Sequence, residues 1–269
     1  MTLAIQKSYI SQRTEEYLLS SCTPEVISKA LQEKLYILLG TSCSGKSTFC
    51  NELSKRLPHV VSLEYDDRLR DITLLFFYKL APNSFTRVFN ALGKSLLHYL
   101  DINFKTDFFA KKRCCQLSHL GPHLAVLTSL FKKHAPYLRE RTYSSLLEDS
   151  KRLTCLGRRV IIHVVGRRGF SKFGPFKPKI VLFHCPLDDV IRRAINRNRR
   201  ARLEDTPLDY RKIDIVATQY NALFNKNNRF VRPGLREDIK RSTNLKPIFV
   251  DASLPTEDSV TNFIKDMTP

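Results

Sequence analysis

The chain has 269 residues, of which 42% are hydrophobic and 10% aromatic, with 9 Gly and 13 Pro. This composition excludes a disordered, collagen-like or low-complexity chain, because enough apolar side chain is present to bury a core. The 45 Lys and Arg against 26 Asp and Glu give a net charge of +19, which favours partners that carry phosphate or carboxylate groups.

The positive charge is concentrated in residues 151–250, which hold 24 Lys or Arg against 8 Asp or Glu. The excess in this region, +16 of the total +19, predicts that the later part of the chain builds an anion-facing surface. Nucleic acid is therefore a possible partner. The alternative interpretation is a basic background composition that serves solubility alone.

The cysteine pattern and the amino-terminal sequence bear on the compartment. The 7 cysteines include no CxxC pair, which fits a reducing environment better than a disulfide-linked fold. Residues 1–17 contain no apolar stretch of signal-peptide length, and no window of the chain has the length and apolarity of a membrane span. We expect a cytoplasmic protein with no membrane partner; export without a signal peptide would leave no trace in this pattern.

Residues 1–33 are predicted to form a helical extension, with Thr23 as N-cap and Pro24 in the first turn. The run LYILLG that follows is a short apolar segment typical of a strand buried on both faces. The segment SGKSTFCNELSKRL then predicts a helix, and HVVSLEY predicts a second strand that closes on the pair Asp66 and Asp67.

Residues 70–155 carry long apolar-periodic stretches, which predict a helical insertion that would serve as a substrate lid. Strand patterns return in RRVIIHVVG and PKIVLFHC, which are separated by the Gly/Pro/basic loop GRRGFSKFGPFKP. The helix patterns LDDVIRRAINRNRR and LDYRKIDIVATQYNALF follow, then the strand pattern KPIFVDA and the helix pattern EDSVTNFIKDM. This alternation predicts an α/β fold, a three-layer, doubly wound and mostly parallel sheet. Residues 34–69 and 156–269 would form its nucleotide-binding core.

The turn between the first predicted strand and its helix matches the phosphate-binding pattern GxxxxGK[ST]. We expect the nucleotide to be bound by the residues of this turn and by the next residue of the helix: Gly40, Thr41, Ser42, Cys43, Ser44, Gly45, Lys46, Ser47 and Thr48. The glycines permit torsions that let successive N–H groups curl round an anion, and the helix dipole adds positive potential. We predict that Lys46 contacts the β- and γ-phosphates of ATP and that Ser47 binds Mg²⁺. The alternative is a glycine-rich turn with a solvated lysine.

Two motifs that GTPases require are missing from this sequence, and this narrows the class of phosphate-loop protein. GTPases need a base-recognising NKxD segment and an aspartate that opens DxxG at the third strand. This chain has NKNN at 225–228 and HVVG at 163–166, which leaves the compact kinases as the expected class.

Four segments carry a resemblance to known proteins: LYILLGTSCSGKSTF, LEYDDRL, IVLFHCPLDDVIRRAINRNRRAR and IFVDASLPTEDSV. Together they resemble the P-loop phosphotransferases typified by chloramphenicol phosphotransferase-like proteins, with zeta toxins and small-molecule kinases such as shikimate kinase as more distant relatives. They cover about a third of the chain. The resemblance implies transfer of the γ-phosphoryl group of ATP to a hydroxyl of a small molecule.

The resemblance also implies roles for individual residues. Asp66, at the predicted end of the second strand, would be the general base or a ligand of the metal's water, as a carboxylate near the γ-phosphorus can be. Arg193, Arg197 and Arg200 share one helix face. The resemblance places these arginines in a lid over the nucleotide. There Arg193 and Arg197 would stabilise the transferring phosphoryl group, and Arg200 would bind the nucleotide. The alternatives are a solvated turn for Asp66 and a solvated helix face for the arginines.

The chain departs from the family at the third strand, where relatives place an aspartate and this sequence has His163. Three interpretations are open for His163: a base, a substrate contact or a hydrogen-bonded core residue. Two further functions remain possible: a polynucleotide kinase or nucleic-acid-responsive ATPase that uses the basic region 151–250, and a nucleotide-binding switch without transfer activity.

Overall fold

The structure is a computed structural model. It describes residues 22–92, 120–164, 172–200, 208–225, 228–243 and 245–267. The chain divides into two compact units, the first made of Met1–Glu64 with Leu146–Pro269 and the second of Tyr65–Ser145. The sequence places the insertion at 70–155. The first 21 residues of the predicted helical extension lie outside the described residues.

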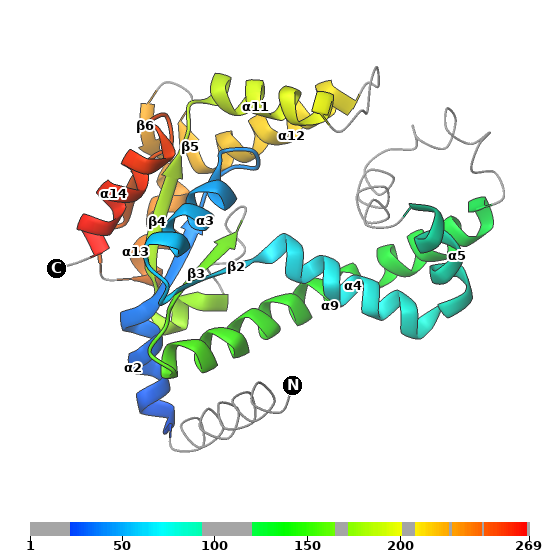
Figure 1. The fold of residues 1–269 in the computed structure, drawn as a ribbon, viewed down its shortest axis with the longest axis horizontal. Helices are drawn as coiled ribbons and strands as arrows, with labels where there is room; N and C mark the ends of the chain where they lie inside the picture. The colour runs from blue at the N-terminus through cyan, green and yellow to red at the C-terminus, as the bar shows by residue number, and fades with distance from the viewer. Residues whose placement is uncertain are drawn as a thin grey trace, which may run out of the picture. The chain divides into compact units, whose positions relative to one another are not determined.

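A parallel sheet of five strands forms the centre of the first unit (Figure 1). Its strands are β1 (Leu35–Leu39), β2 (Val60–Glu64), β3 (Arg159–Val164), β4 (Lys179–His184) and β7 (Ile248–Asp251). They lie in the order β2-β3-β1-β4-β7, and every neighbouring pair is parallel. Parallel neighbours need crossover connections, and helices follow β1, β2 and β4 along the chain. The predicted α/β class with a mostly parallel sheet is confirmed.

Helices occupy the connections of the first unit. They are α2 (Pro24–Lys34), α3 (Lys46–Arg56), α11 (Leu187–Arg200), α12 (Leu208–Leu223), α13 (Pro233–Ser242) and α14 (Thr256–Met267). A short 3₁₀ turn, η2 (Gly174–Phe176), precedes β4. Thr23 caps α2, its side chain accepting a hydrogen bond from the Val26 N–H at 3.4 Å, as the sequence predicts.

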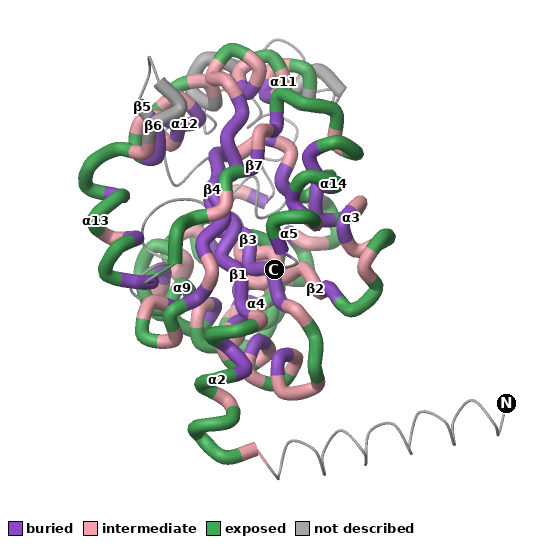
Figure 2. Tube along the Cα trace, turned by 90° about the vertical axis from the view of Figure 1, so that its left-hand side faces the viewer, coloured by how far each residue is buried: buried purple, intermediate pink, exposed green. Residues whose placement is uncertain are grey.

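Successive residues of each strand point to opposite faces of the sheet, and both faces are covered. On one face, Phe49 of α3 contacts Phe183 of β4 and Phe263 of α14, with ring centroids 5.2 and 5.4 Å apart. On the other face, His184 of β4 contacts Tyr220 of α12. As a consequence, β1, β3 and β4 are buried along almost their whole length (Figure 2).

The second unit is helical. It contains α4 (Tyr65–Leu80), α5 (Pro82–Leu92) and the larger part of α9 (Gly121–Cys155). Phe77, Val88 and Leu127 are fully buried together, so this unit has an apolar core of its own. α-Helices include every described residue of the segment 70–155 except Ala81 and Leu120, in agreement with the predicted helical character.

Two local predictions were wrong. The second strand ends at Glu64, and Tyr65 and Asp66 begin α4. Asp66 and Asp67 fall in the first turn of that helix, where negative side chains are stabilised by the helix dipole. Phe224, assigned from its spacing to the helix pattern, lies in β5 (Phe224–Asn225), which pairs antiparallel with β6 (Asn228–Val231).

The segment that follows this hairpin forms α13, a helix that was not predicted. Strands of two and four residues are too short to show periodicity, and only Pro233 at the start of α13 was a visible signal. Among the described residues no helix is both long and apolar enough to cross a membrane.

Candidate functional site

The segment Gly40–Ser47 forms the turn between β1 and α3, at the carboxyl end of the central strand. From β1 the chain passes through α3 to the sheet edge at β2, whereas from β4 it passes to the opposite edge at β7. The carboxyl ends of β1 and β4 therefore border the point where the winding direction reverses. Open α/β sheets bind ligands at this crevice.

The backbone of the Gly40–Ser47 loop depends on its glycines. A Cβ atom on Gly40 would lie 2.9 Å from the carbonyl oxygen of Phe183, so the loop approaches β4 more closely than a side chain permits. Gly45 has a φ of 102° and Cys43 a φ of 62°, both in the left-handed region. The Ser44 hydroxyl donates to the carbonyl oxygen of Thr41 at 2.8 Å and so closes the turn.

The first turn of α3 receives no hydrogen bond from a capping side chain, because Gly45 occupies the N-cap position. Helices leave up to four N–H groups at this end without helical partners, and their dipole favours negative charge there. The arrangement of a tight loop followed by such a helix end is suited to a phosphate group.

Lys46 lies with its ammonium group on the loop itself. Its Nζ donates to the carbonyl oxygens of Gly40 at 2.9 Å and of Thr41 at 2.6 Å, and the residue is only 7% exposed. A buried ammonium is tolerated when its donors are satisfied. The positive charge is therefore held within the turn and is not directed at bulk solvent.

A carboxylate that the sequence analysis missed lies next to Ser47. The Ser47 hydroxyl donates to Oε1 of Glu64, the last residue of β2, at 3.0 Å. A hydroxyl and a carboxylate are oxygen ligands of the kind that Mg²⁺ takes, usually with water and substrate phosphate completing its shell. Groups of three or more His, Cys, Asp or Glu suited to a metal are absent from the described residues.

The metal ligands had been predicted as Ser47 and Asp66. The structure brings Glu64 to Ser47 and puts Asp66 at an exposed position in the second unit, in the first turn of α4. The signal available in the sequence was weak: Glu64 stands two positions before the acidic pair, inside the predicted strand.

Arg193 of α11 contacts the loop. Its Nη1 donates to the carbonyl oxygen of Ser44 at 2.7 Å and its Nη2 to that of Ala252, just after β7, at 3.2 Å. The guanidinium thus joins the Gly40–Ser47 loop to the end of another strand. Arg197 and Arg200 lie further along α11, and their side chains are outside the described part of the structure.

Gln219 of α12 is a second contact that the sequence did not reveal. Its Oε1 accepts a hydrogen bond from the Ser42 N–H at 3.0 Å. The helix in this region was predicted from the spacing of its apolar residues. A polar residue between them, such as Gln219, gives no sequence signal that it contacts the loop. Through Gln219 and Arg193, two helices contact the loop from elsewhere in the first unit.

His163 proves to be a core residue of β3. It is 3% exposed, and its Nε2 lies 2.8 Å from the hydroxyl of Ser62 on β2. Burial lowers the pKa of His163 to about 3, and the nearby charge of Lys46 adds to this effect. The imidazole is therefore neutral at physiological pH and does not replace the negative charge of the family's third-strand aspartate.

Comparisons with known proteins add no family to these observations. No protein-family model matches the chain, and no curated protein is significantly similar to it.

Proposed function

We propose that the chain is a Mg²⁺-dependent phosphotransferase that binds ATP at the Gly40–Ser47 loop. The observation that supports this most is the combination of a glycine-dependent loop, a buried Lys46 ammonium and the Ser47–Glu64 oxygen pair at one strand end. Each component suits a different part of a metal-bound triphosphate: the backbone and lysine the phosphates, and the oxygen pair the cation.

The residues have distinct tasks in this proposal. Loop N–H groups and Lys46 bind the phosphates, while Ser47 and Glu64 hold the metal and its water. Bound Mg²⁺ supplies screening of the charge on the transferring phosphoryl group. Arg193 and Gln219 keep the loop in position through the Ser44 carbonyl and the Ser42 N–H. Catalysis of this kind rests on positioning and charge stabilisation.

The proposed acceptor is a hydroxyl of a small molecule. Its oxygen attacks the γ-phosphorus, the bond to the β,γ-bridging oxygen breaks, ADP leaves, and a carboxylate takes the hydroxyl proton. Asp66 is the base that the family resemblance implies, and this role remains a prediction.

The test is transfer of label from γ-labelled ATP to separate pools of metabolites, nucleotides, RNA and protein. We expect Mg²⁺-dependent labelling of a metabolite that is lost with Lys46→Ala. Lys55→Ala is the matched control, because Lys55 lies on the same helix with a 74% exposed side chain, paired with Glu52 at 3.4 Å. Asp66→Asn should abolish transfer while leaving ATP binding intact.

The outcomes separate the alternatives. Labelling of RNA or oligonucleotides in place of metabolites would establish the polynucleotide kinase, which the excess of +16 in residues 151–250 favours. Calorimetric binding of ATP without transfer to any pool would establish a nucleotide-binding switch. Absence of Mg²⁺-dependent heat on mixing the folded protein with ATP or GTP would refute the whole proposal.

A further inference from the structure

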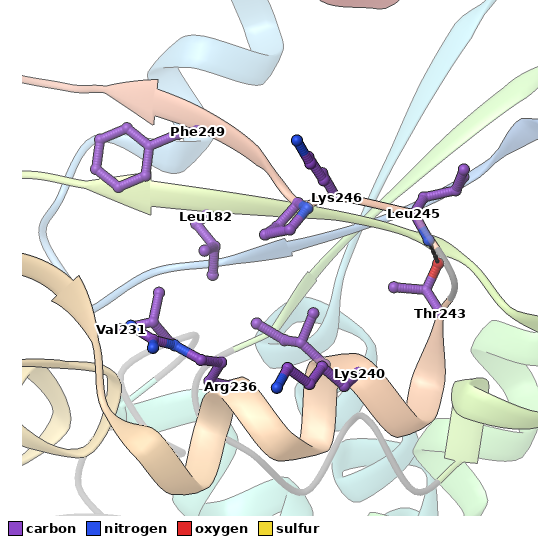
Figure 3. A pocket seen from close by; sticks show the side chains of 10 residues that line it. Leu182, Val231, Arg236, Lys240, Thr243, Leu245, Lys246 and Phe249 are labelled. Carbon is purple, nitrogen blue, oxygen red and sulfur yellow. Dashed lines mark hydrogen bonds between the residues drawn. The ribbon is translucent and has the colours of Figure 1, made fainter.

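A cavity in the first unit shares no residue with the Gly40–Ser47 loop. Its volume is about 900 Å³, and it lies between α13 and the strands β4 and β7 (Figure 3). The lining residues are Leu182, Val231, Arg236, Ile239, Lys240, Thr243, Leu245, Lys246, Pro247 and Phe249. We call this cavity the α13 pocket. Its size falls within the range of small-molecule sites.

Apolar side chains form most of the wall. Leu182 and Phe249 are register partners on β4 and β7, so their side chains share one face of the sheet. Ile239 of α13 lines the same pocket, and Leu182 and Ile239 are almost fully buried while Phe249 remains 39% exposed. A large aromatic ring half open to solvent beside a buried aliphatic floor suits an apolar ligand.

Three cations surround this apolar wall. Arg236 and Lys240 stand four residues apart on one face of α13, and Lys246 lies across the pocket, just before β7 (Figure 3). No acidic residue is among the described residues that line the pocket. Lys240 pairs with Glu237 at 3.3 Å in an exposed position, which is a weak interaction. Neither Arg236 nor Lys246 has an ion pair within the described part of the chain.

We propose that the α13 pocket binds an amphipathic anion, a molecule with an aliphatic tail and a carboxylate or phosphate head. The tail would contact Leu182, Ile239 and Phe249, and the head would lie among the three cations. Charge complementarity selects the anion, since a neutral or cationic amphiphile gains nothing from these side chains.

The lining also distinguishes an aliphatic tail from a nucleobase. Apart from the cations, Thr243 is the only residue of the described lining with a polar side chain, and its Oγ1 already accepts a hydrogen bond from the Leu245 N–H at 3.2 Å. A base edge has several donors and acceptors, and burying them without partners is unfavourable. An aliphatic tail has no such requirement.

The absence of Trp from the sequence gives a direct assay. Phe249→Trp places a single indole in the wall of the pocket. We expect a saturable blue shift of its emission with monomeric dodecanoate or dodecyl phosphate, and none with dodecyltrimethylammonium. Calorimetry on the unmodified protein checks that the substitution did not create the site. The affinity should fall roughly fourfold for each methylene removed from the tail.

Paired charge variants test the role of the head group. Arg236→Gln with Lys246→Gln should weaken dodecanoate binding about tenfold. The matched control is Arg241→Gln with Lys265→Gln, which removes the same charge from exposed residues that do not line the pocket. Unchanged affinity in the first pair, or an equal loss in both, would refute a specific anion site. Circular dichroism establishes that both double variants are folded.

Other occupants give different results. Vesicles of anionic phospholipid that bind the protein when monomeric dodecyl phosphate does not would overturn the proposal in favour of a membrane surface. An RNA oligonucleotide that shifts the indole emission of the Phe249→Trp variant where dodecanoate fails would overturn it in favour of nucleic acid. Dodecanoate binding should persist in Lys46→Ala. A failure of the α13 pocket proposal is therefore distinguishable from a failure of the proposed phosphotransferase function.

Discussion

The Gly40–Ser47 loop and the α13 pocket are both suited to anions, but they are built in opposite ways. In the loop, backbone geometry and one buried lysine supply the positive potential, and the lysine is held by carbonyl oxygens at 2.9 and 2.6 Å. In the pocket, cations on a helix and just before a strand surround an apolar wall. The loop is suited to phosphate through fixed backbone atoms, whereas the pocket would combine apolar contact with adaptable side-chain charge.

The largest expected effect separates the two sites completely. Lys46→Ala removes a preorganised cation from the loop, and we expect phosphoryl transfer to fall by ~10²–10³-fold. Dodecanoate binding should not change, because the pocket contains no loop residue. Single-turnover transfer and calorimetry on the same preparation measure both quantities. Transfer at the unmodified rate in Lys46→Ala would exclude the loop from the reaction.

The next effect concerns the metal, which only the loop is expected to need. Glu64→Gln keeps the shape of the side chain but removes the carboxylate that contacts Ser47. The Mg²⁺ concentration for half-maximal ATP binding should rise about 10–100-fold. Glu257→Gln, at an exposed position on α14, is the control. If Glu64→Gln leaves the Mg²⁺ dependence unaltered, the metal is held elsewhere.

A third effect tests the rigidity of the loop. Gly40→Ala forces a Cβ to within 2.9 Å of the Phe183 carbonyl oxygen, a backbone atom that has little room to move. We expect the free energy of unfolding to fall by about 1–3 kcal/mol in urea denaturation. Gly121→Ala is the control, because no atom lies within 4 Å of the added Cβ. Equal stability of the two variants would show that the close approach has no energetic importance.

The smallest effect is a pH dependence from the buried imidazole of His163 near Lys46; the described lining of the α13 pocket contains no histidine. The pKa of His163 is about 3 when folded, below its ordinary value of 6.5. Between these values the unfolded chain binds a proton that the folded chain does not, so stability falls as the pH falls. This group contributes a loss of about 1 kcal/mol over the first pH unit below 6.5.

His163→Gln should remove that contribution, leaving a flatter dependence of the unfolding free energy on pH in urea titrations. His59→Gln, at an exposed position, controls for the loss of an imidazole. An identical pH dependence in His163→Gln and the unmodified protein would show that His163 takes up its proton equally in both states.

Local patterns determined much of the first unit. Apolar runs predicted β1, β3 and β4, because strands buried on both faces need apolar side chains at every position. The run KPIFVDA also predicted β7, although this edge strand is partly exposed. The Gly40–Ser47 loop was predicted for the same kind of reason: a strand, a glycine-rich turn and a helix are consecutive in the chain, and the spacing of the motif reflects their geometry. The hairpin of β5 and β6 was missed because it is too short to show a period.

The partners of the loop depended on the order of the strands. Glu64, Arg193 and Gln219 are 17, 149 and 177 residues from the loop atoms they contact, and no local pattern relates such positions. The boundary between β2 and α4 likewise decided that Glu64, and not Asp66, meets Ser47. The α13 pocket needed the pairing of β4 with β7 before Leu182 and Phe249 could share a wall.

The sequence by itself thus determined the strand–loop–helix that carries the glycines and Lys46, because these residues act on their own neighbours through torsion, spacing and helix dipole. Only the tertiary structure decided which carboxylate faces Ser47, which side chains hold the loop and where an apolar cavity meets three cations. These contacts join residues far apart in the chain, and their positions follow from sheet order and helix packing, which a linear pattern does not encode.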